Sequence, residues 1–180
     1  MRIISGVYKS RVIKVPSKTD SIRPTSDSAR ETLFNIITNR TNLDGITCLD
    51  LFCGSGSVGL ECISRGAGKC VFVDRDTAVI KGNIALLCAE SQSEIVRNEA
   101  IRFLKKSAGE SFGLIFADPP YKYEKYFELI KAVSEYRCMF ILEHSARVDI
   151  PEELKTYVIL EKKTGITNFT FFDFGSVVDS

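Results

Sequence analysis

The sequence contains no tryptophan, a single histidine and only five prolines among its 180 residues. No apolar run approaches the roughly 20 residues that a helix needs to cross a bilayer, which argues against a transmembrane protein. The apolar stretch in the opening Met1-Arg2-Ile3-Ile4-Ser5-Gly6 is too short for a secretory signal peptide. We therefore expect a cytoplasmic protein with no membrane partner.

The six cysteines form no Cys-x-x-Cys pair, and the only histidine is His144. The sequence therefore predicts neither a disulfide framework nor a zinc site, and we expect no metal. Cys48, Cys70 and Cys138 stand inside apolar runs and are interpreted as small buried hydrophobic residues. Only Cys53 stands where a ligand could reach it.

The length suits one domain with a short appendage, because 180 residues can bury a single core but leave little room for two. No low-complexity tract or fixed-period repeat interrupts the chain. We expect residues 1–40 to form an N-terminal appendage and residues 41–180 to form the main domain. We also expect a monomer.

The net charge of +1 conceals an uneven distribution. Residues 1–30 contain seven Lys and Arg residues against two Asp residues, a net charge of +5, so the other 150 residues carry −4. Lys and Arg that contact a nucleic-acid backbone release its condensed counterions, which favours binding. Charge alone fits a solvated surface equally well, but it marks as candidate RNA-contacting residues Arg2, Lys9, Arg11, Lys14 and Arg30.

Apolar periodicity predicts an α/β fold. Residues 2–15 alternate loosely and predict a short basic β-hairpin, and residues 29–37 have helical spacing with Thr25 or Ser26 as N-cap. From Ile46 onward, apolar runs alternate with helical patterns, as in a parallel sheet built from βαβ units. The expected strands are 47–52, 70–74, 94–97, 114–117 and 139–143, and the expected helices are 58–64, 77–89, 100–107 and 126–136.

The C-terminal segment has a different pattern. Residues 156–160 and 168–174 are strand-like, and a turn-bearing segment at 162–165 joins them. This pattern predicts an antiparallel hairpin at one edge of the sheet.

A glycine-rich motif, Asp50-Leu51-Phe52-Cys53-Gly54-Ser55-Gly56, lies between an expected strand and an expected helix, where a doubly wound sheet binds a nucleotide. With Gly59 it also spells the dinucleotide-binding pattern G-x-G-x-x-G, and Asp74 stands at the spacing of the ribose-binding acid. The spacing therefore leaves a nicotinamide-dependent dehydrogenase open.

Asp50 favours a different cofactor. A carboxylate at the end of the first strand would lie close to a pyrophosphate on the helix N-terminus and repel it. The same charge would stabilise a cofactor that carries an ammonium and a sulfonium, while Asp74 could still accept hydrogen bonds from its ribose. The motif therefore favours S-adenosylmethionine.

Glu99 follows the third expected strand and has two interpretations of equal weight. It could accept a hydrogen bond from the amino group of an adenine bound beside the sheet. It could instead cap the helix that begins at Ala100, because an acid suits the positive end of a helix.

The segment Asp118-Pro119-Pro120-Tyr121 directly follows the fourth expected strand. Two prolines fix φ and remove backbone donors, which leaves nearby carbonyls as acceptors in a rigid loop. Acceptors that hold both hydrogens of an exocyclic base amine help to make its nitrogen tetrahedral, and Asp118 and the Pro119 carbonyl suit that role. Tyr121 offers a ring on which an unstacked base can stack. A simple turn is the alternative, which the neighbouring glycine motif disfavours.

A sulfonium already activates its methyl group, so alignment of amine, methyl and sulfur should supply most of the catalysis. No strong general base is then required. His144 is accordingly interpreted as structural or as part of a base pocket, with a general base as the alternative.

The chain resembles the RsmD family of bacterial small-subunit ribosomal RNA guanine-N2 methyltransferases over nearly its whole length. The resemblance rests on Arg2-Ile3-Ile4-Ser5-Gly6, Arg23-Pro24-Thr25, Arg30-Glu31-Thr32-Leu33-Phe34-Asn35, Leu49-Asp50-Leu51-Phe52-Cys53-Gly54-Ser55-Gly56, Ser64-Arg65-Gly66-Ala67, Asp118-Pro119-Pro120-Tyr121 and Glu143-His144-Ser145. It implies a Rossmann-like class I methyltransferase fold with a seven-stranded, mostly parallel sheet, a C-terminal antiparallel hairpin and an N-terminal hairpin and helix. It also implies methylation of the exocyclic N2 of one guanine in 16S ribosomal RNA of the small subunit.

By the family's pattern, residues 118–121 are catalytic and hold the target amine, and residues 23–35 close over cofactor and base. Two positions depart from that pattern: Glu99 stands where Asp is usual, and Cys53 stands where Ala is usual. The residues expected around S-adenosylmethionine are Arg23, Thr25, Asp50, Phe52, Cys53, Gly54, Ser55, Gly56, Asp74, Arg75, Glu99, Ala100 and Asp118.

The Asp-Pro-Pro-Tyr motif does not identify the acceptor by itself. Similar loops serve DNA adenine-N6 and protein glutamine methyltransferases, so N6-adenine methylation of DNA or RNA is the alternative function. The lack of a large target-recognition insert argues against a site-specific DNA enzyme. An RNA-binding protein without turnover is the non-enzymatic alternative.

Overall fold

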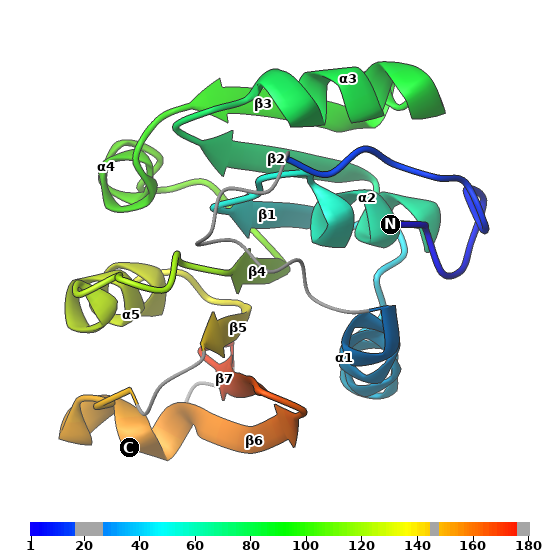
Figure 1. The fold of residues 1–180 in the computed structure, drawn as a ribbon. Coiled ribbons are helices and arrows are strands. Elements are labelled where there is room, and N and C mark those ends of the chain that lie inside the picture. Colours follow the sequence, from blue (N-terminus) through cyan, green and yellow to red (C-terminus); the bar gives the residue numbers. More distant parts are fainter. Residues whose placement is uncertain (17–26, 145–147, 176–180) are drawn as a thin grey trace.

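The structure, a computed structural model of the 180-residue chain, describes residues 1–16, 27–144 and 148–175. The predictions made for Arg23, Thr25, Ser26 and Ser145 lie outside the described residues. The strands form one seven-stranded sheet in the order β3-β2-β1-β4-β5-β7-β6 (Figure 1). Helices cover both faces of this sheet (Figure 1).

Five neighbouring strands of the sheet are parallel: β1 (Thr47–Leu51), β2 (Lys69–Asp74), β3 (Ser93–Arg97), β4 (Leu114–Ala117) and β5 (Met139–His144). β7 (Thr167–Asp173) pairs antiparallel with β5, and β6 (Val158–Thr164) pairs antiparallel with β7. The predicted fold class is therefore confirmed: the sheet is mostly parallel and ends in an antiparallel hairpin.

The predicted bounds of that hairpin need correction. Its ladder continues to the pair Thr164↔Thr167, so the turn contains only Gly165 and Ile166 and does not begin at residue 162. Gly165 has φ +64, a conformation that two-residue hairpin turns require and that glycine adopts without strain. The expected strand start at residue 156 is also wrong, because Glu152–Tyr157 forms the 3₁₀ helix η2.

Two hydrophobic clusters lie on the two faces of the sheet. α1 (Asp27–Arg40), α2 (Ser57–Ser64) and α3 (Ala78–Leu87) pack into one, whereas α4 (Ala100–Lys106), α5 (Tyr126–Ser134) and η2 pack into the other; the short 3₁₀ helix η1 (Glu90–Gln92) leads into β3. In β1, Cys48 joins the first cluster while Leu49 and Leu51 join the second, because successive strand side chains point to opposite faces. None of the described helices is long and apolar enough to span a membrane.

The N-terminal segment, residues 1–16, forms less regular pairing than the expected β-hairpin. It contains a single antiparallel bridge between Arg2 and Val12, flanked by a hydrogen bond from the Ile13 amide to the Met1 carbonyl at 3.0 Å. Ile3 and Ile13 are almost fully buried and belong to the cluster that also holds α1, α2 and α3. The segment therefore shares the main core, and the domain boundary at residue 40 stays a prediction.

Two glycines allow the packing of the N-terminal segment to be tested. A Cβ atom at Gly6, which has φ +80, would lie 1.6 Å from the Ser64 carbonyl oxygen, whereas one at Gly82 in α3 would meet nothing within 4 Å. We expect Gly6→Ala to lower the free energy of unfolding by at least about 2 kcal/mol. Gly82→Ala should instead raise it by about 0.5–1 kcal/mol. Urea unfolding measures both, and equal stabilities of the two variants would contradict the close approach.

Candidate functional site

A cavity of about 340 Å³ opens at the carboxyl ends of β1, β2, β4 and β5. β1 and β4 are neighbours although β2 and β3 lie between them in sequence, so the strand order reverses here, as at the ligand sites of doubly wound sheets. Most of the predicted site residues line this cavity: Phe52, Cys53, Gly54, Ser55, Asp74, Arg75, Glu99, Ala100, Asp118, Pro119, Pro120 and Tyr121.

The glycine loop after β1 leaves space for a ligand at Gly54 and uses Gly56 for packing. Both glycines have positive φ, +52 and +74. A Cβ atom at Gly54 would find no atom nearer than 4.0 Å, whereas one at Gly56 would lie 2.0 Å from Cδ1 of Ile80. Phe52 also has positive φ, +58, which is strained for a residue with a side chain and is typical of functional loops.

Asp74, at the end of β2, holds the glycine loop in place. Its two carboxylate oxygens accept hydrogen bonds from the Gly54 amide at 2.9 Å and from the Asp76 amide at 3.0 Å. A carboxylate has about four lone-pair positions, so Asp74 can still accept further hydrogen bonds from a ligand in the cavity.

Asp50 lies beneath the cavity wall rather than in it. Its side chain is only 3% exposed, and its Oδ2 accepts a hydrogen bond from the Gly59 amide at 3.0 Å. Burial raises the pKa of Asp50 to about 8; the Gly59 hydrogen bond counteracts the rise, and the charges of Asp74 and Glu143 add to it. Asp50 therefore braces the first turn of α2 and favours a positive charge nearby.

Asp118 stands beside Glu143 at the ends of two paired strands. Ala117 of β4 pairs with Leu142 of β5, so the next residue along each chain is Asp118 and Glu143 respectively, and both line the cavity. The Asp118 side chain is exposed toward the cavity, but the surrounding protein limits its hydration. This desolvation raises the pKa of Asp118, and the charges of Glu143 and Asp50 raise it further. Repulsion by neighbouring negative charges raises the pKa even of an exposed carboxyl group.

The loop after Asp118 offers an aromatic surface. Tyr121 is 64% exposed at the cavity, while the Pro120 carbonyl is already used as the acceptor of a 2.8 Å hydrogen bond from the Tyr123 amide. The Tyr123 ring packs edge-on against Phe52 at 5.2 Å between centroids and closes the cavity on that side. Sequence reasoning missed Tyr123, although the aromatic spacing after β4 was a usable signal.

Glu99 caps α4, because its side chain accepts a hydrogen bond from the Arg102 amide at 2.9 Å. It also lines the cavity, so capping is confirmed and the adenine contact stays a prediction. His144, at the end of β5, lines another part of the cavity, and its Nε2 is 2.9 Å from the Thr170 hydroxyl, which orients the ring from β7. That contact supports a structural or pocket-shaping role for His144.

Sequence reasoning also missed the walls formed by distant segments. The N-terminal segment contributes Met1, Val15 and Pro16, and the β6–β7 turn contributes Ile166 and the adjacent Thr167. The local sequence gives no sign of either contribution, because each depends on contacts between residues that are far apart in the sequence. Within residues 1–16, 27–144 and 148–175 no group of side chains suited to a metal ion is found.

Four of the five predicted RNA-contacting residues are exposed, namely Arg2, Lys9, Arg11 and Lys14. The prediction for Arg30 is wrong, because its side chain is 0% exposed. Its guanidinium instead donates to the Arg2 carbonyl at 2.7 Å and pairs with Asp27 at 2.6 Å. Helical spacing directs the Arg30 side chain to the side of α1 that faces the core. There it anchors the N-terminal segment to α1.

Comparisons with known proteins agree over nearly the full length of the chain. A family model described as conserved hypothetical protein 95 matches residues 1–173. YlbH of Bacillus subtilis (strain 168), named as a candidate rRNA methyltransferase, is 38% identical over 183 residues, covering 96% of this chain and 98% of YlbH. Ribosomal RNA small subunit methyltransferase D of Haemophilus influenzae is 31% identical over 185 residues, covering 96% of this chain and 93% of that protein. The solved structure of yhhF, a candidate methyltransferase of Escherichia coli, matches with a TM-score of 0.80 at 29% identity, covering 96% of this chain and 97% of yhhF.

The raised pKa of Asp50 gives a prediction for stability. The folded chain retains the Asp50 proton up to about pH 8, whereas an ordinary Asp loses it near 3.8, so unfolding releases a proton between these values. The free energy of unfolding should therefore fall as pH rises through this window. Asp50→Asn should flatten that fall by up to about 1.4 kcal/mol per pH unit. Urea unfolding at pH 5, 6.5 and 8 checks this, and parallel curves would contradict it.

Proposed function

The chain belongs to the family described as conserved hypothetical protein 95, the RsmD family, and from that membership we propose that it methylates small-subunit ribosomal RNA. The methyl donor is S-adenosylmethionine, and the acceptor is the exocyclic N2 of a guanine. The observation that carries the proposal is the shared cavity of the glycine loop after β1 and the Asp-Pro-Pro-Tyr loop after β4. Because β1 and β4 pair in parallel, the residues proposed to bind the methyl donor and those proposed to hold the acceptor amine lie at the same edge of the sheet.

The residues present fit the proposed cofactor. Asp74, Asp118 and Glu143 line the cavity, so the strand ends present carboxyl groups to a positive ligand, and the charge of that ligand would also favour ionisation of Asp50 below them. A pyrophosphate would meet repulsion there. The open space at Gly54 lets a ligand approach the backbone closely.

S-adenosylmethionine supplies a methyl group already activated by a positively charged sulfur. The chain's part is to hold the acceptor amine in line with that methyl group and to exclude competing water. Asp118 and the Pro119 carbonyl accept hydrogen bonds from the amine, and Tyr121 stacks on the base. After transfer the nitrogen is cationic and acidic, so Asp118 or water accepts its proton without a stronger base.

The RNA-facing surface is assigned to the exposed cations of the N-terminal segment. Lys9, Arg11 and Lys14 are exposed on residues 1–16, and the same segment forms part of the cavity wall through Val15 and Pro16. A phosphate backbone that binds these cations would lie next to the cavity. The names of the relatives support ribosomal RNA as acceptor, and the choice of guanine over adenine rests on the sequence resemblance.

We expect Asp118→Ala to keep most of its affinity for S-adenosylmethionine, because Asp74 and Glu143 remain, but to transfer methyl groups at least about 100-fold more slowly, because the amine loses an acceptor. Labelled methyl transfer to purified small subunits measures the rate, and nucleoside analysis of the product distinguishes N2-methylguanosine from N6-methyladenosine. Glu124→Ala is the matched control, since Glu124 is an exposed acid of the same connection that does not line the cavity. Wild-type turnover by Asp118→Ala would remove Asp118 from its role, and methyladenosine would overturn the acceptor.

Charge removal on the N-terminal segment should weaken RNA binding in a salt-dependent way. For the double variant Lys9→Gln, Lys14→Gln, we expect the slope of log affinity against log salt to fall in magnitude by about 1.5, because two phosphate contacts are lost. The control is Lys105→Gln, Lys106→Gln, which removes two exposed cations from α4 on the opposite face. Filter binding to a 16S rRNA transcript measures both, and equal slopes for the two variants would show that the segment does not contact phosphate.

A further inference from the structure

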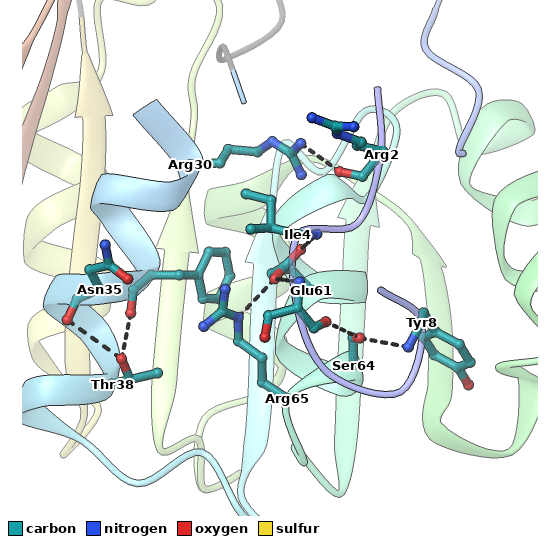
Figure 2. Close-up of polar contacts among 11 residues, drawn as sticks. Arg2, Ile4, Tyr8, Arg30, Asn35, Thr38, Glu61, Ser64 and Arg65 are labelled. Carbon is teal, nitrogen blue, oxygen red and sulfur yellow. Dashed lines mark hydrogen bonds and ion pairs between the residues drawn. The ribbon is translucent and has the colours of Figure 1, made fainter. Parts of the chain in front are cut away.

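Three buried polar side chains fix the N-terminal segment to the helices beneath it. The Glu61 carboxylate of α2 accepts from the Ile4 amide at 2.7 Å and the Ser5 amide at 3.0 Å, as Figure 2 shows for Ile4. Ser64, also on α2, accepts from the Tyr8 amide at 2.9 Å (Figure 2). Both contacts end on α2 and do not reach the cavity.

The third anchor, Asn83 of α3, does reach the cavity wall. Its side chain is 0% exposed, and its Oδ1 accepts from the Lys14 amide at 2.8 Å while its Nδ2 donates to the Lys14 carbonyl at 2.9 Å. The second Nδ2 hydrogen is donated to the Ser55 carbonyl at 2.8 Å. One carboxamide therefore joins Lys14 to Ser55, which is a cavity-lining residue of the glycine loop.

The two segments joined by Asn83 have different proposed partners. Lys14 has an exposed side chain on the surface assigned to RNA, and the next residues, Val15 and Pro16, line the cavity. Ser55 lies between Gly54, which is open to the cavity, and Gly56, which packs on Ile80 of the same helix α3. Three hydrogen bonds through one carboxamide thus connect the Lys14 backbone to the glycine loop.

We propose that Asn83 is a positioning residue that couples RNA docking on the N-terminal segment to cofactor binding in the glycine loop. This inference rests on the proposed function. The carboxamide makes the segment and the loop move as one unit, so a ligand that restrains the remaining motion of either one also restrains the other. The second ligand then loses less conformational freedom when it binds, which makes the binding of the two mutually favourable.

The coupling is measured with S-adenosylhomocysteine, which cannot donate a methyl group, and a 16S rRNA transcript. For the wild type we expect the transcript to bind at least about 5-fold more tightly when S-adenosylhomocysteine is saturating, and the reverse effect to have the same size. Asn83→Ala should reduce this factor to near 1. A loss of general stability would not give this result, because each ligand would then favour the folded chain and the apparent coupling factor would rise instead of falling.

Ser64→Ala provides the matched control, because it loosens the same segment at α2 without touching the glycine loop. It should weaken transcript binding and keep the wild-type coupling factor. Equal coupling in Asn83→Ala and the wild type would overturn the inference, as would loss of coupling in Ser64→Ala to the same extent. A wild type that binds both ligands independently would overturn the inference alone, and one that binds neither would overturn the proposed function too.

Hydrogen exchange in the wild type keeps the inference testable if Asn83→Ala does not fold. Addition of the transcript should slow amide exchange across residues 53–57, including the Gly56 amide that donates to the Cys53 carbonyl. Unchanged exchange in that loop at saturating transcript would overturn the inference. Residues 129–133 of α5, on the opposite face and outside the cavity, serve as the internal reference and should show no change.

Discussion

The parallel pairing of β1 with β4 is the constraint on which the site depends. Residues 48–51 pair in register with residues 114–117, so the loops that follow the two strands emerge together at one edge of the sheet. The chain between them forms β2 and β3, which lie in the sheet on the other side of β1. The cavity, the glycine loop and Asp118 therefore meet because of the strand order, whatever ligand they bind.

That strand order also concentrates negative charge. Asp50, Asp74, Asp118 and Glu143 come from four neighbouring strand ends, and burial with mutual repulsion raises the pKa values of Asp50 and Asp118. Such a cluster opposes folding when it is ionised, because burial removes hydration from Asp50 and the negative charges repel one another. A cationic ligand would relieve the same repulsion. The arrangement is thus more useful for binding than for stability, which is typical of functional sites.

Sequence reasoning located the parts of the site that depend on local pattern. Buried parallel strands have continuous apolar runs, and Gly54, Asp74 and Asp118 could be placed because each follows such a run. It failed where tertiary contacts decide. Arg30 was assigned to a basic surface by charge alone, but helical spacing directs its side chain inward, where it bonds to the Arg2 carbonyl. Residue 166 and residues 15–16 reach the cavity only through the hairpin turn and the docking on α3, for which the sequence has no local signal.

Residues 1–16 are docked on the helices of the main domain, so this basic segment differs from a mobile arm. A mobile arm would lose conformational entropy whenever it met RNA, which weakens binding per contact. In this chain Glu61, Ser64 and Asn83 satisfy the segment's backbone groups, and Ile3 and Ile13 are buried in the main core. The exposed cations are therefore presented on a fixed surface beside the cavity. A fixed surface can align a phosphate backbone with the Asp118 loop, and this alignment is the contribution that a methyl transfer with an already activated donor requires most.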